Sequence, residues 1–150
     1  MEIVKKIVTI LALSLSLFAS DIIIKQSACG MNETTEKLKN IISSSGLHIF
    51  AIINHSGNAK MVDMKLNDSK MIVFGNAKLG TALMQQDMTV GLDLPLSVLV
   101  FRDIDGKIKM AYRDGSWLAD KHILNAPQKV QKINAAMDKF TTKAGQCKKD

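Results

Sequence analysis

The alternation of hydrophobic and polar positions along the chain predicts five strands. Runs rich in β-branched and apolar residues occupy residues 21–28, 47–53, 70–74, 96–102 and 107–112, which is the pattern of short strands. The run at 107–112 alternates Lys107 and Lys109 with Ile108 and Met110, so we expect one face of this strand to lie in water. The run at 47–53 is almost wholly apolar, so we expect it to lie within the sheet.

Two longer segments carry apolar residues at three- and four-residue steps, the spacing of one helix face. The first is expected to begin at an Asn32 cap and to end at Gly46; the second is expected to begin near Asn125, with Pro127 in its first turn, and to end at Gly145. Their apolar stripes are Leu38, Ile41 and Ile42, and Val130, Ile133, Met137, Phe140 and Ala144. This order of elements, with short helical insertions between the later strands, predicts an α+β domain: one mostly antiparallel sheet with helices packed on one face.

The first twenty residues have the layout of a secretory signal. The segment "MEIVKKIVTILALSLSLFAS" has a basic start, an apolar run over residues 7–18, and small residues at Ala19 and Ser20. The apolar run is shorter than the roughly 20 residues that a membrane-spanning helix needs. We therefore predict a signal peptide over residues 1–20, a single domain over 21–150, and a periplasmic or secreted protein without membrane attachment after cleavage.

The distribution of charge along the chain does not favour nucleic acid as a partner. The formal charge of +6 is spread along the chain, and with one Tyr and one Trp there is no stacking platform beside a basic stripe, so nucleic acid is not an expected partner.

The sequence has two cysteines, Cys29 and Cys147. Such a pair tends to form a disulfide in an oxidising compartment, and we expect this disulfide; two free thiols are the alternative.

The segment "MIVFGNAKLGTALMQQ" is the main candidate for a binding site. A strand that ends in Gly-Asn and turns into a helix presents unpaired backbone N–H groups, and the helix dipole there favours an anion. The candidate ligand-binding residues are Gly75, Asn76, Lys78, Gly80 and Thr81. The spacing matches neither the phosphate loop nor the dinucleotide fingerprint, and we expect no cofactor. The alternative is a capped turn in which Gly80 only allows a helix to approach the sheet.

Two further residues could carry acid–base chemistry. If His55 and Asp93 converge beside Asn76, His55 could act as a general base, whereas Asp93 could equally cap backbone N–H groups. His48 and His122 are expected to be structural residues.

Methionines offer a second kind of site. Met61 and Met64 form a Met-x-x-Met pair, and thioethers suit Cu(I) outside the cytoplasm, although Met is more often a filler of irregular cores. We predict no metal site, with this pair as a weak candidate.

The stretches "NHSGNAK" and "KMIVFGNAKLGTALMQQDMTVGLDLPLSVLVFRDIDGKIKMAY" resemble the domain of unknown function 302 family (DUF302). The matching positions are His55 and Ala59, residues 74–76, Gly80 and Thr81, Met84, residues 92–95, and Tyr112. Ala77 departs from the family, which usually has Pro there.

The resemblance implies a compact α+β domain with a TATA-binding-protein-like layout, β-α-β(4)-α, that is often a dimer. It implies no catalytic activity. Our leading hypothesis is therefore an exported domain that binds a small, possibly anionic ligand at the turn after the third predicted strand. The alternatives are a homodimeric interaction module without a ligand and an enzyme with His55 as its base.

Overall fold

A single five-stranded sheet organises residues 21–147, the part of the chain that the computed structural model describes. The predicted signal over 1–20 lies outside the described residues. The strands are β1 (Ile23–Gln26), β2 (His48–Asn54), β3 (Ser69–Gly75), β4 (Leu96–Arg102) and β5 (Ile108–Tyr112). Their order in the sheet is β1-β5-β4-β3-β2, and all four pairings are antiparallel. The predicted α+β fold class is confirmed.

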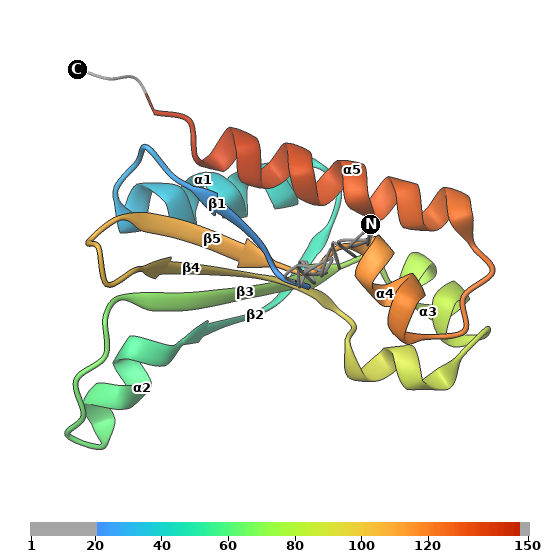
Figure 1. The fold of residues 1–150 in the computed structure, drawn as a ribbon, viewed down its shortest axis with the longest axis horizontal. Helices are drawn as coiled ribbons and strands as arrows, with labels where there is room; N and C mark the ends of the chain where they lie inside the picture. The colour runs from blue at the N-terminus through green and yellow to red at the C-terminus, as the bar shows by residue number, and fades with distance from the viewer. Residues whose placement is uncertain (1–20, 148–150) are drawn as a thin grey trace, which may run out of the picture.

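The helices surround this sheet unevenly. They are α1 (Met31–Ser44), α2 (His55–Met61), α3 (Ala77–Met84), the 3-10 helix η1 (Met88–Leu92), α4 (Gly115–Lys121) and α5 (Pro127–Ala144). Figure 1 shows α1 and α5 over one side of the sheet, α2 projecting at one end of the strands, and α3 and α4 gathered at the other end. Within the described residues, none of these helices is long and apolar enough to span a membrane.

The core lies between the sheet and the two long helices. Strand residues that alternate toward the helices are buried, and they meet the apolar stripes that the sequence predicted. The main contributors are Ile72, Phe74, Val98, Val100 and Met110 from the sheet, and Leu38, Ile42, Ile133, Met137 and Phe140 from the helices. Each such side chain contributes about 1.5–3 kcal/mol when fully buried, so this layer supplies most of the stability.

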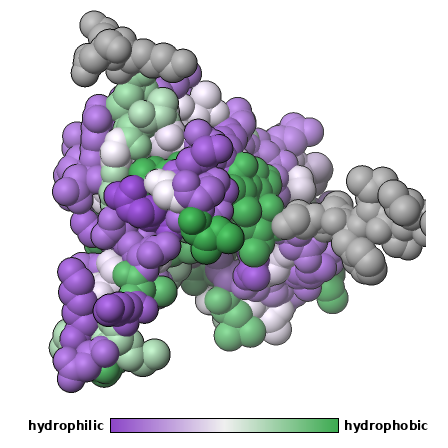
Figure 2. Space-filling view, turned by 60° about the vertical axis from the view of Figure 1, so that its left-hand side comes forward, coloured by the Kyte–Doolittle hydropathy of each residue, from purple (hydrophilic) through white to green (hydrophobic). Residues whose placement is uncertain are grey.

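Among the described residues, no long helix lies over the opposite face of the sheet. Met71, Val73, Leu99 and Ala111 alternate with the buried strand residues and are only half-buried. Large hydrophobic side chains also remain at the surface, and Figure 2 shows a continuous hydrophobic area, with hydrophilic residues around it, on the face that it displays. The described helices therefore leave part of the apolar surface uncovered.

Strand β2 corrects one prediction. It forms an edge of the sheet rather than lying inside it, with Phe50 50% and Ile52 45% exposed. An apolar run does not distinguish a central strand from an edge strand, because strand order depends on pairing with distant segments.

Helix starts were predicted with mixed success. The first helix begins at Met31 with Gly30 at its cap position, not at Asn32, whose side chain instead accepts a hydrogen bond from Lys70 at 3.5 Å. Helix α4 was not predicted; Asp114 caps it by accepting a hydrogen bond from the Trp117 amide at 3.0 Å. Pro127 stands in the first turn of α5, as expected.

A disulfide ties the two long helices together. Cys29 precedes α1 and Cys147 follows α5; the two residues are at disulfide-bonding distance, with Cα atoms 5.3 Å apart across 118 positions of sequence. The predicted pairing is confirmed.

Candidate ligand-binding site

The turn between β3 and α3 has the local geometry that its sequence predicted. Asn76 is in an extended conformation, and its Oδ1 accepts a hydrogen bond from the Leu79 amide at 3.0 Å, which caps the helix. The Asn76 carbonyl accepts from the Gly80 amide at 2.9 Å. The amides of Ala77 and Lys78 have no hydrogen-bond partner within residues 21–147. Two donors therefore remain available at the positive end of α3.

Of these two residues, Lys78 lines a cleft of about 1130 Å³ between α3 and α5. Lys78 from α3 and Lys129 and Lys132 from α5 line it, and no Asp or Glu is among its lining residues in the described chain. None of the three lysines forms a hydrogen bond or ion pair within that part of the chain. The remainder of the wall is largely apolar and includes Leu47, Phe74, Leu79, Leu96, Ile133 and Met137. The cleft thus combines unneutralised positive charge with an apolar floor.

A second, smaller hollow of about 190 Å³ lies on the other side of α3. Ala77, Gly80, Thr81 and Met84 face it, as residues three and four apart on one helix side do. Its other walls are Phe50, Leu94, Pro95, Leu96 and Ile133. The predicted site residues therefore divide between two spaces: Lys78 lines the cleft, Gly80 and Thr81 line the hollow, and Gly75 and Asn76 line both.

His55 does not join this site. Strand β2 pairs antiparallel with β3, so that His48 stands opposite Gly75 and Asn54 opposite Lys70. His55 follows Asn54, and a separation of about six strand residues places it roughly 20 Å along the sheet from the turn. The condition for an acid–base pair, convergence of His55 and Asp93 beside Asn76, is therefore not met. His48, expected to be structural, is the histidine next to the turn.

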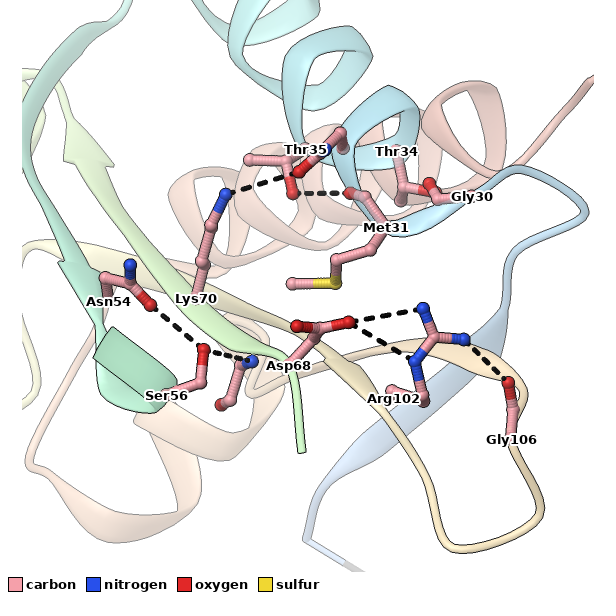
Figure 3. A network of polar contacts seen from close by, with 12 residues as sticks. Gly30, Met31, Thr34, Thr35, Asn54, Ser56, Asp68, Lys70, Arg102 and Gly106 are labelled. Carbon is pink, nitrogen blue, oxygen red and sulfur yellow. Dashed lines mark hydrogen bonds and ion pairs between the residues drawn. The ribbon is translucent and has the colours of Figure 1, made fainter. Parts of the chain in front are cut away.

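The surroundings of His55 are occupied by structural hydrogen bonds. Asn54 caps α2 by accepting from the Gly57 amide at 2.9 Å, and Ser56 Oγ donates to Asn54 at 3.0 Å. Figure 3 shows this group beside the Asp68–Arg102 ion pair, in which the two side chains are 3.2 Å apart. Over residues 21–147, no hydrogen bond or ion pair joins His55 to a carboxylate.

Asp93 instead belongs to a histidine cluster that the sequence did not predict. His122 follows α4 with its side chain only 7% exposed; its Nε2 lies 2.7 Å from Asp93 Oδ2 and its Nδ1 lies 3.0 Å from Thr89 Oγ1. Asp87 Oδ1 accepts from the Thr89 hydroxyl at 2.6 Å, and its Oδ2 accepts from the Ile123 amide at 3.0 Å. The cluster fastens η1 to the end of α4. No spacing rule links His122 to residues about thirty positions earlier.

Hydrogen bonds occupy the polar side chains of this cluster. Hydrogen bonds from the Thr89 hydroxyl, and then from the Ile123 and Thr89 amides, lower the pKa of Asp87 from 3.8 to about 2, so this carboxyl is ionised at neutral pH. The single hydroxyl proton of Thr89 is therefore given to Asp87, and Thr89 Oγ1 accepts from Nδ1–H of His122. Both ring nitrogens of His122 are therefore engaged within the cluster, Nδ1 with Thr89 and Nε2 with Asp93.

The metal candidates are not assembled into a site. Met61 and Met64, at the end of α2 and in the loop after it, are 82% and 66% exposed. Within the described residues, the one group of three acidic, Cys or His ligands consists of Cys29, Glu33 and Cys147, and its sulfur atoms are paired with each other. A disulfide offers no thiolate for a metal.

Comparison with known proteins identifies the family. The family model "Domain of unknown function DUF302" matches residues 23–141. The chain belongs to the DUF302 family. A DUF302 crystal structure from Bacillus stearothermophilus has the same fold, with a TM-score of 0.67, 18% identity, and 85% of this chain and 97% of that chain covered. The resemblance stated from the sequence motifs is thus confirmed.

Two curated relatives are longer than the segment that this chain matches. "Fluoride-specific ion channel FluC 1" of Brucella suis is 35% identical over 109 residues, which cover 73% of this chain and 43% of the relative. The protein of the same name from Brucella abortus is also 35% identical over 109 residues, and 40% of it is covered. The chain spans less than half the length of these relatives.

Proposed function

We propose that this DUF302 domain is a binding module for a small anionic ligand, which it holds at the start of α3. The observation that supports this proposal is the group of three lysines, Lys78, Lys129 and Lys132, which line one cleft without a neutralising carboxylate among its walls. The amides of Ala77 and Lys78 are unpaired at the start of α3, and Lys78 lines the same cleft.

Physical chemistry favours an anion there for two reasons. Three positive charges around one concave space raise the local potential, which concentrates anions and speeds their entry. The helix start adds two N–H donors and the positive end of the α3 dipole, worth about 0.3–1 kcal/mol for a partly exposed charge. The relatives named as fluoride-specific channels make fluoride one anion to include among the probes.

The proposal is tested by isothermal titration with phosphate, sulfate, fluoride and acetate. We expect at least one anion to bind, and the triple variant Lys78→Gln/Lys129→Gln/Lys132→Gln to lose at least tenfold in affinity. Lys139→Gln is the matched control, because Lys139 lies on α5 but does not line the cleft. Equal affinity in the triple variant and the wild type, or no binding of any anion, would refute the proposal.

A homodimer is a second candidate property, favoured by the open face of the sheet. Leu99 lies between Met71 and Ala111 at the middle of this half-buried apolar face, and monomers rarely expose large continuous apolar patches. We expect light scattering to give twice the monomer mass, and Leu99→Glu to give the monomer. Ile104→Glu, on the exposed β4–β5 turn, is the control that should stay dimeric. A wild-type monomer at tens of micromolar would contradict this candidate.

We also propose that the domain acts outside the cytoplasm, because residues 1–20 have the composition of a secretory signal. Mass spectrometry of the protein recovered from the periplasm should give a chain that begins near Asp21. Recovery of the full-length chain from the cytoplasm would contradict export.

A further inference from the structure

We infer that the ligand is an amphipathic organic acid: a carboxylate held by the cleft lysines, joined to an apolar group about the size of a phenyl ring that fills the hollow beside Gly80. This inference rests on the proposed function and specifies its ligand class.

The two spaces meet at the start of α3. Gly75, Asn76, Leu79, Leu96 and Ile133 line both the cleft and the hollow. A molecule with its charged group near Lys78 and the free helix amides can therefore place a second group past Asn76, on the Gly80 side of the helix. An inorganic anion would use only the cleft.

The apolar walls of the hollow disfavour the binding of a polar group. Apart from Asn76 and Thr81, its lining side chains are apolar, and the Asn76 Oδ1 already accepts the Leu79 amide. A polar group placed there would lose its water without gaining enough partners. A cavity of about 150 Å³ lined by Leu, Ile and Phe can hold benzene, so a hollow of about 190 Å³ suits a ring or a branched group of similar size.

The two glycines of the turn support this assignment. A Cβ built on Gly80 would lie 3.8 Å from Leu94 Cδ1, and a Cβ on Gly75 would lie 3.6 Å from Pro95 Cβ and 3.7 Å from Phe50 Cε2. These are ordinary contact distances, so the packing of the protein does not require glycine at either position. Gly80 nevertheless costs α3 helix stability. A residue without a side chain keeps the hollow open. A ligand that occupies the hollow would explain why glycine stands at position 80 although it lowers the stability of the helix.

The test compares three probes by isothermal titration: 3-phenylpropanoate, acetate and the neutral 3-phenylpropanol. We expect 3-phenylpropanoate to bind at least tenfold more tightly than either of the others. Gly80→Leu, which fills the hollow, should reduce the affinity for 3-phenylpropanoate at least tenfold and leave that for acetate within twofold. Gln85→Leu is the matched control, because Gln85 ends α3 outside both spaces.

A second measurement on the wild-type protein does not depend on folding of the variant. Intermolecular nuclear Overhauser effects should join the phenyl protons to the methyl groups of Leu94 and Met84. Contacts to other parts of the surface would overturn the inference.

The outcomes separate this inference from the proposed function. If acetate or phosphate binds as tightly as 3-phenylpropanoate, and the triple lysine variant weakens both, the amphipathic class is wrong while anion binding stands. If no acid or inorganic anion binds, both proposals fail.

Discussion

Replacing Gly80 with alanine tests whether this glycine is needed for packing or only keeps the hollow open. The position is inside α3, where Gly is about 1 kcal/mol less favourable than Ala. The new methyl group would meet Leu94 Cδ1 at 3.8 Å, an ordinary contact that costs no rearrangement. We therefore expect Gly80→Ala to raise the free energy of unfolding by about 0.5–1 kcal/mol. For a domain of this size, the melting temperature should rise by about 2–5 °C.

The assay is urea unfolding followed by circular dichroism, with the reduced and oxidised proteins kept separate. Gly115→Ala is a control of opposite sign: a Cβ there would lie 2.6 Å from the Val130 carbonyl oxygen and 3.0 Å from Ile133 Cβ, so the backbone of α5 would have to move. We expect a loss of about 1–3 kcal/mol for that variant. Loss of stability in Gly80→Ala would refute the reasoning, because it would mean that packing excludes a methyl group at position 80.

Four further outcomes follow from the structure. Asn76→Ala removes the α3 cap and should cost about 1 kcal/mol in chemical denaturation. His122→Phe leaves the Asp93 carboxylate and the Thr89 hydroxyl without their ring partner and should cost about 2 kcal/mol in the same assay. The pKa of Asp87 is lowered to about 2, so its contribution is present above pH 3.8 and is lost as pH falls toward 2; Asp87→Asn should flatten that part of the melting-temperature profile. Reducing the Cys29–Cys147 disulfide frees a loop of more than 100 residues and should lower stability by about 4–5 kcal/mol, measured with and without dithiothreitol.

Local features of the fold were readable from the sequence, because local chemistry determines them. The bounds of β4 at residues 96–102, the capping role of Asn76 and the place of Pro127 all agree with prediction. Each depends on residues within one turn of one another. The family assignment and the half-solvated strand β5 follow from equally local patterns.

Long-range features were not readable from the sequence. The position of β2 at the sheet edge depends on which strands pair with β3, and an apolar run such as 47–53 suits either place. His122 reaches Asp93 because α4 returns the chain beside η1, and α4 itself was not predicted. For the same reason, the sequence did not show that His55, which matches the family motif, and the turn after β3 lie at opposite ends of the sheet.

The histidine cluster and the hollow are connected through three consecutive residues. Asp93 is held by His122, while the next two residues form a wall of the hollow, with Leu94 opposite Gly80 and Pro95 opposite Gly75. Asp87, at the beginning of η1, is held by Thr89 and by the Ile123 amide, so the η1 segment is fixed at both ends. A wall made from a loop can keep a defined shape only if the loop is anchored, and these contacts supply the anchor. The role that this geometry supports for His122 is therefore to position the wall of the hollow, and the candidate binding site extends structurally from the lysines of α5 to the end of α4.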